Sequence, residues 1–150
     1  PLPESNPPRA DLAPPRTKVR AMAKFAGAGV ALVEYGSGES LKTRLLLRAL
    51  RPAAYLPVDI SDAALQKAAR QLGKDFPWLI TTPVLGDFSR PIELPRARAR
   101  RVVYFPGSTI GNLVARTAVD LLRAMKESNQ VVRDYQLEDS DGSYLVRLRG

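Results

Sequence analysis

The sequence predicts an α/β fold, in which a partial parallel sheet is flanked by helices and followed by a C-terminal hairpin. Short apolar runs alternate with segments of helical periodicity over residues 30–126, which is typical of a parallel sheet covered on both faces. Farther along, the β-rich runs 131–137 and 143–148 flank an Asp-Gly pair, which favours a hairpin turn.

The order of the elements follows from these patterns. The predicted strands span 30–34, 54–58, 78–85 and 101–105. The predicted helices span 17–29, 40–50, 61–72 and 113–126.

Capping residues set the limits of the two central helices. Ser40 is the expected N-cap of the first, and Pro52 lies just beyond its end. Ser61 or Asp62 caps the second, which is expected to end at Gly73.

Right-handed crossovers predict the sheet topology. They place strand 30–34 centrally, with 54–58 and 78–85 on one side and 101–105 on the other. An incomplete sheet would leave the edge beside 101–105 exposed, and the chain could self-associate there. Ligands of such sheets bind at the carboxyl ends of the strands, near the point where the strand order reverses. The segments at that edge are 34–40, 59–62, 86–90 and 105–112.

Length and composition predict one folded domain with two appendages. The chain has 150 residues, and residues 1–16 carry six of its 13 prolines. We therefore expect a disordered leader over 1–16, a folded domain over 17–127 and a strand or hairpin tail over 128–150.

Several function classes are disfavoured by composition. The chain has no cysteine and no histidine, so thiolate chemistry is excluded and a zinc site is not expected. No apolar run approaches the roughly 20 residues of a membrane span, and the leader lacks the apolar core of a secretory signal. These observations predict a cytoplasmic protein without a membrane partner.

The net charge of +8 raises the question of nucleic-acid binding. Four arginines cluster at positions 96, 98, 100 and 101. No aromatic residue lies among them to stack on bases, so solvated surface charge is the favoured interpretation and nucleic acid is not the expected partner.

A glycine turn follows the first predicted strand. Gly36 and Gly38 permit a positive φ and lack the Cβ atoms that would bar a close ligand. Asp59 ends the second strand, where a carboxylate can accept hydrogen bonds from ribose hydroxyls. Asp59 could instead cap the following helix, but Ser61 and Asp62 are available for that purpose, so the ribose role is favoured.

Two more segments at this edge carry polar or aromatic side chains. Asp87 and Phe88 follow the third strand and suit an adenine ring, although an Asx turn beside a core phenylalanine would look the same. Asn112 follows the fourth strand, where its amide could contact an amino acid or cap the next helix.

These segments together favour S-adenosylmethionine (SAM) over a dinucleotide. A pyrophosphate requires a close glycine-rich approach to a helix N-terminus, where Glu39 would repel it. The ammonium of an aminoacyl tail would tolerate Glu34 or Glu39 nearby.

Four stretches resemble, in order and spacing, the histidine-specific SAM-dependent methyltransferases, which include the L-histidine Nα-methyltransferases of ergothioneine biosynthesis. The stretches are VEYGSGESLKTRLLLRAL, YLPVDISDAALQKAARQL, FPWLITTPVLGDFSRPIEL and RVVYFPGSTIGNL, within residues 30–125. The resemblance implies a Rossmann-like class I methyltransferase core that transfers methyl groups from SAM to the α-amine of histidine or a related amino acid.

The resemblance also implies roles for individual residues. Cofactor contacts are implied for Gly36, Ser37, Gly38, Lys42, Asp59, Asp87 and Phe88. Asn112 matches the asparagine that helps to hold the amino-acid substrate. The resemblance implies no catalytic side chain and no metal ligand.

The segments at either end depart from the family pattern. Residues 1–16 stand where the family has an aromatic-bearing helical segment, and residues 128–150 do not match the family's substrate domain. We therefore expect a truncated or rearranged member whose 150 residues hold the cofactor half of the site. The alternatives are a non-catalytic SAM-binding module and a basic nucleic-acid-binding protein.

Overall fold

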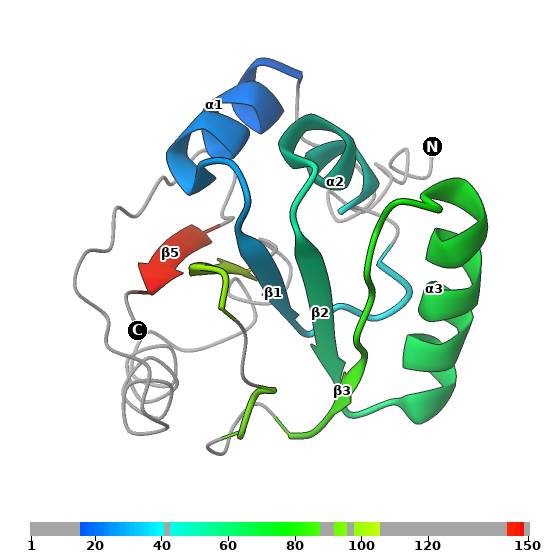
Figure 1. Ribbon diagram of the computed structural model, residues 1–150. Coiled ribbons are helices and arrows are strands. Elements are labelled where there is room, and N and C mark those ends of the chain that lie inside the picture. Colours follow the sequence, from blue (N-terminus) through cyan, green and yellow to red (C-terminus); the bar gives the residue numbers. More distant parts are fainter. Residues whose placement is uncertain (1–15, 41–42, 88–91, 96–97, 106–143, 149–150) are drawn as a thin grey trace, which may run out of the picture.

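A computed structural model describes residues 16–40, 43–87, 92–95, 98–105 and 144–148 (Figure 1). Its helices are α1 (Arg16–Ala26), α2 (Arg44–Leu50) and α3 (Asp62–Asp75). Its strands are β1 (Ala31–Tyr35), β2 (Ala54–Asp59), β3 (Val84–Leu85), β4 (Arg101–Phe105) and β5 (Tyr144–Leu148).

The strands form one sheet in the order β3-β2-β1-β4-β5. β1 pairs in parallel with β2 and β4, and β2 pairs in parallel with β3. This arrangement confirms the order predicted from right-handed crossovers.

The edge beside β4 differs from the expectation. β5 pairs with β4 in antiparallel orientation, with Tyr104 opposite Leu145. The expected exposed edge beside β4 is therefore wrong, and because β5 covers β4, self-association through that edge is not supported. Three further predictions lie outside the described residues: strand 131–137, the turn at 141–142 and helix 113–126.

β3 is much shorter than the predicted strand over 78–85, and proline explains the difference. Tyr55 exchanges backbone hydrogen bonds with Ile80 and Thr82, and the ladder resumes where Gly86 N–H donates to Asp59 O. Between these points Pro57 has no N–H to offer, so the pairing is interrupted.

α2 also begins later than predicted. Ser40 is not its N-cap, because that position is occupied by Thr43 and because Ser40 has a left-handed φ of 59° where an N-cap residue usually has extended backbone. The helix starts at Arg44 after Thr43, whose side chain makes no capping bond. The far end is as expected: Arg51 takes a left-handed conformation, its N–H donates to Leu47 O, and Pro52 follows.

α3 confirms the predicted cap. Ser61 Oγ accepts a hydrogen bond from Ala64 N–H at 3.2 Å, and Asp62 lies in the first turn, where its charge favours the helix dipole. The helix passes through Gly73 and ends at Asp75, so Gly73 does not terminate it.

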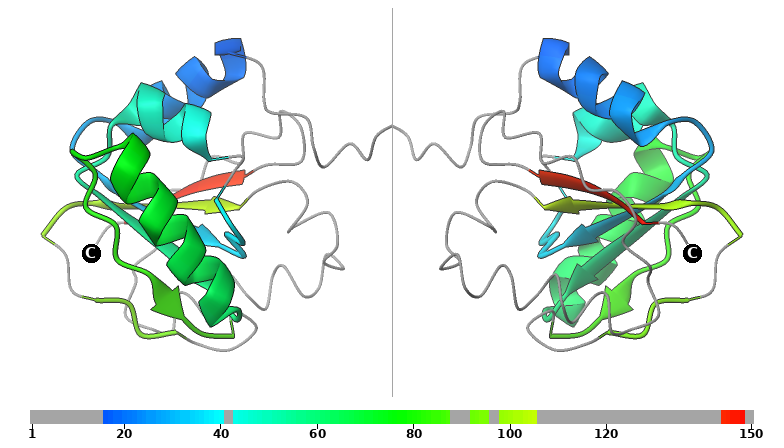
Figure 2. Two further views of the ribbon diagram at one scale, coloured as in Figure 1. Left: turned by 90° about the vertical axis from the view of Figure 1, so that its right-hand side faces the viewer. Right: turned by 90° about the vertical axis from the view of Figure 1, so that its left-hand side faces the viewer.

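Alternation along the strands divides the core into two layers. Leu32, Tyr55 and Val102 face the helices, where they pack with side chains of α1, α2 and α3. Figure 2 shows these three helices on the same side of the sheet. Val33 and Val58 face the other side and pack with Ile92, Leu94 and Ala99. None of the helices in the described part of the chain is long and apolar enough to cross a membrane.

Tyr35 belongs to the second core layer, and its burial makes the stability of the fold vary with pH in the alkaline range. Burial raises the pKa of Tyr35 to about 12 from 10.0, and the positive charge of Arg101 lowers it only in part. Because the folded-state pKa is the higher one, the contribution of Tyr35 to stability is complete below about pH 10. It is lost as the pH rises toward 12.

We expect the free energy of unfolding to fall by about 2–3 kcal/mol over this interval through Tyr35. Denaturant unfolding at stepped pH values measures the fall, with Tyr35→Phe as the comparison. The variant should show a smaller alkaline loss than the unsubstituted chain. Equal slopes for the two proteins would contradict this origin of the pH dependence.

Candidate functional site

The glycine turn after β1 is attached to the end of β2 by backbone hydrogen bonds. Gly36 N–H and Ser37 N–H both donate to Val58 O, at 2.8 and 3.2 Å. Gly38 N–H donates to Asp59 Oδ2 at 2.8 Å. The sequence therefore predicted correctly that the turn and Asp59 lie together, because the carboxyl ends of neighbouring parallel strands meet.

The two glycines adopt the conformation for which glycine is suited. Gly36 has a φ of 69° and Gly38 a φ of 55°. Apart from its chain neighbours, no described residue has an atom within 4 Å of a Cβ built on Gly38, so none of the described residues would bar a ligand from that side of its Cα.

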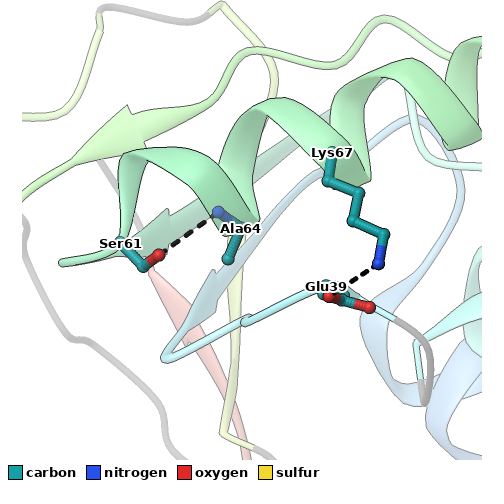
Figure 3. A network of polar contacts seen from close by, with 4 residues as sticks. All are labelled: Glu39, Ser61, Ala64 and Lys67. Carbon is teal, nitrogen blue, oxygen red and sulfur yellow. Dashed lines mark hydrogen bonds and ion pairs between the residues drawn. The ribbon is translucent and has the colours of Figure 1, made fainter.

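Asp59 joins two turns rather than capping α3 through its side chain. Its Oδ1 accepts from Ser61 N–H at 2.9 Å, while Oδ2 accepts from Gly38 N–H. Figure 3 shows that the α3 cap is Ser61, which bonds to Ala64. An ionised carboxylate has about four acceptor positions, so Asp59 keeps capacity for a ligand's hydroxyl groups.

Ser37 places a polar atom without a partner in the turn. Its side chain is 9 % exposed, and Oγ has no hydrogen-bond partner among the described residues. A buried hydroxyl without a partner is costly, so a partner from outside the described residues would recover that free energy.

Glu39 forms an ion pair that the sequence analysis did not anticipate. Lys67 Nζ, on α3, lies 3.0 Å from Glu39 Oε1 (Figure 3). Both side chains are half exposed, so the pair itself contributes little stability. Because Lys67 offsets the charge of Glu39, Glu39 would repel a pyrophosphate less than its charge alone suggests.

Exposed apolar side chains lie on either side of Asp59. Ile60, the next residue, is 67 % exposed, and Leu85, the β3 residue that pairs with Asp59, is 59 % exposed. The sequence analysis missed both, because an apolar residue at a strand end looks like core. Asp87 is exposed at the end of β3, on the same edge of the sheet. Lys42, Phe88 and Asn112 lie outside the described residues.

A buried polar network below the turn was also missed. Glu34, the fourth residue of β1, is 1 % exposed, and its Oε1 accepts hydrogen bonds from Thr43 Oγ1 at 2.5 Å and from the Tyr55 hydroxyl. Ser40 Oγ lies 2.8 Å from Tyr55 Oη. The only signal in the sequence was an acid inside an apolar run. No group of three acidic side chains in the described residues could hold a metal ion.

Comparison with known proteins identifies the family. The model of the family "Histidine-specific methyltransferase, SAM-dependent" matches residues 2–138. The match extends beyond the stretch 30–125 on which the resemblance was based, so the expected departures from the family pattern at residues 2–16 and 128–138 are wrong.

Two curated relatives are histidine N-alpha-methyltransferases. The chain is 37 % identical to that of Mycolicibacterium smegmatis over 134 residues, which are 86 % of this chain and 41 % of the relative. It is 36 % identical to that of Mycobacterium tuberculosis over 129 residues, or 83 % of this chain and 40 % of the relative. The chain therefore spans about two fifths of these relatives.

Solved structures share the fold at low sequence identity. A glycopeptide N-methyltransferase complexed with sinefungin aligns with a TM-score of 0.56 and 18 % identity, covering 79 % of this chain and 47 % of its own. A SAM-dependent methyltransferase from Aquifex aeolicus aligns with a TM-score of 0.53 and 12 % identity, covering 95 % and 93 %. These matches support a Rossmann-like class I methyltransferase fold.

The family match over most of the chain and the two relatives above one third identity agree with the sheet order and with the pairing of the glycine turn with Asp59. The chain belongs to the histidine-specific, SAM-dependent methyltransferase family.

Proposed function

We propose that this chain forms the SAM-binding part of an N-methyltransferase that acts on the α-amine of histidine or a related amino acid. The observation that carries the proposal is the contact between Asp59 and Gly38, at 2.8 Å, in a chain of this family. It brings an acceptor for ribose hydroxyls next to a turn that a ligand can approach closely.

The residues of the site fit the parts of this cofactor. Asp59 would accept from the ribose hydroxyls, and the exposed side chains of Ile60 and Leu85 offer apolar surface for the adenine ring. The turn residues Gly36, Ser37 and Gly38 would lie against the aminoacyl tail. Asp87 would serve the adenine amine, and Lys42 and Phe88 complete the proposed set.

The chemistry requires positioning more than side-chain catalysis. Bound SAM supplies an electrophilic methyl group on a sulfonium. The acceptor amine must be held in line with that methyl group after losing its proton, and exclusion of water favours the transfer. We assign substrate binding to Asn112 and name no catalytic side chain.

The wider setting is part of the same proposal. Successive transfers to the amine of histidine would give a trimethylated betaine, as in ergothioneine biosynthesis. We place the reaction in the cytoplasm, where SAM and free amino acids are both available. We propose no metal ion and no membrane or nucleic-acid partner.

Asp59→Ala tests the cofactor site. We expect S-adenosylhomocysteine to bind the unsubstituted chain, and the variant to lose about 10- to 100-fold in affinity. The expected loss corresponds to removal of one or two hydrogen bonds between the carboxylate and the ribose. Isothermal titration calorimetry measures both dissociation constants.

The matched control is Asp75→Ala. Asp75 is also an acid and pairs with Arg44, but it lies at the far end of α3, about 20 Å along the helix from Ser61. This variant should bind S-adenosylhomocysteine as the unsubstituted chain does. Absence of binding by the unsubstituted chain, together with salt-sensitive RNA binding, would replace the proposal by the nucleic-acid alternative.

A transfer assay with SAM and L-histidine tests the extent of the activity. Because the chain spans about two fifths of its relatives, we expect these 150 residues to bind the cofactor but to give little or no methylated histidine. Mass spectrometry of the amino acid detects the products. Robust trimethylation would show that the described site and its neighbours suffice for turnover.

A further inference from the structure

The hydroxyl groups around Glu34 form a series of hydrogen bonds in which the donor of each bond can be assigned. Tyr55 carries one hydroxyl proton, which it donates to Glu34 Oε1. Tyr55 Oη therefore accepts the bond from Ser40 Oγ. Burial and the charge of Glu34 hold the pKa of Tyr55 well above its ordinary value, so the phenol keeps this proton. All four side chains of the network, including Thr43, are at most 1 % exposed.

This series of hydrogen bonds ends at Ser40, a strained residue of the glycine turn. Ser40 has a φ of 59°, a conformation that is unfavourable for residues with a Cβ. Its N–H donates to Ser37 O at 2.9 Å, which closes the segment from Ser37 to Ser40. Such strain persists where the surroundings impose it, and here the bond to Tyr55 fixes the side chain.

The two ends of the turn are therefore attached to opposite ends of β2. At its start, Gly36 and Ser37 are bonded to Val58, near the end of β2. At its end, Ser40 is bonded to Tyr55, near the start of β2, and through Tyr55 to Glu34 of β1. Gly38, which donates to Asp59, lies between these attachments.

We propose that Ser40 and Tyr55 are positioning residues that hold the glycine turn in its ligand-binding shape before the cofactor arrives. The identity of the ligand rests on the proposed function, but the holding of the turn does not. A turn ordered in advance spares the ligand the entropy of ordering it, so the network raises the affinity without touching the cofactor.

Two substitutions break the same bond from opposite sides. Ser40→Gly removes the hydroxyl and also relieves the left-handed strain, whereas Tyr55→Phe removes the acceptor and leaves the strain in place. We expect each to weaken S-adenosylhomocysteine binding about 5- to 10-fold. Because both variants lose one shared interaction, the double variant should bind no more weakly than the weaker single variant.

A second readout needs no ligand. Amide hydrogen exchange of Gly38 should accelerate about 10-fold or more in both single variants, because the turn opens more often when its end is released. Ser40→Ala separates strain from hydroxyl loss: it should bind as weakly as Ser40→Gly but melt at a lower temperature, since alanine keeps the unfavourable φ. A merely structural role would make affinity follow thermal stability across these variants.

The matched control is Thr81→Val, which removes a buried hydroxyl that has no partner among the described residues. It should leave both the affinity and the exchange of Gly38 unchanged. The inference is overturned if the losses from Ser40→Gly and Tyr55→Phe multiply in the double variant, or if Gly38 exchange is unaffected by either. Failure of the unsubstituted chain to bind S-adenosylhomocysteine would count against the proposed function, while the exchange rates would still decide the inference.

Discussion

The attachment of the glycine turn to the end of β2 is the contact on which the candidate site depends. Val58 O accepts hydrogen bonds from the N–H groups of Gly36 and Ser37, and Asp59 Oδ2 accepts one from Gly38 N–H. These bonds continue the parallel register of β1 and β2, in which Tyr35 lies opposite Val58. A change in this register would separate the carboxylate from the turn, so the central pairing of the sheet also sets the geometry of the site.

Much of this architecture could be predicted from local patterns. The apolar runs at β1, β2 and β4 marked buried strands, and the handedness of crossovers then fixed their order. The features that could not be predicted depended on residues far apart in the sequence or on an interrupted pattern of backbone hydrogen bonds. The truncation of β3 needed the knowledge that Pro57 would lie opposite it. The pairing of β5 with β4 joins residues about forty positions apart, which no local pattern reports.

The residues of the site likewise include some that could be predicted from the sequence and some that could not. The turn and Asp59 were predictable because both follow strands whose carboxyl ends must meet. Ser40 was assigned to a cap because serine before an apolar run usually is one, and its left-handed φ has no signature in the sequence. Tyr55 lies within the predicted strand 54–58, and no separate role was predicted for it. Its ring is indeed buried there, while its hydroxyl serves the network.

Glu34 is a buried acid whose presence can be explained physically. A carboxylate that is 1 % exposed carries a large desolvation cost, which the hydroxyls of Thr43 and Tyr55 offset through charge-assisted hydrogen bonds. An apolar residue at position 34 would avoid that cost, so stability alone gives no reason for the acid. Directional bonds offer what an apolar contact does not, because they fix the orientations of the groups that make them. Glu34 orients the Tyr55 hydroxyl, and that hydroxyl in turn holds Ser40 in a conformation that it would not adopt unaided. The buried charge is thus better explained by the shape that it imposes on the turn than by any contribution to folding.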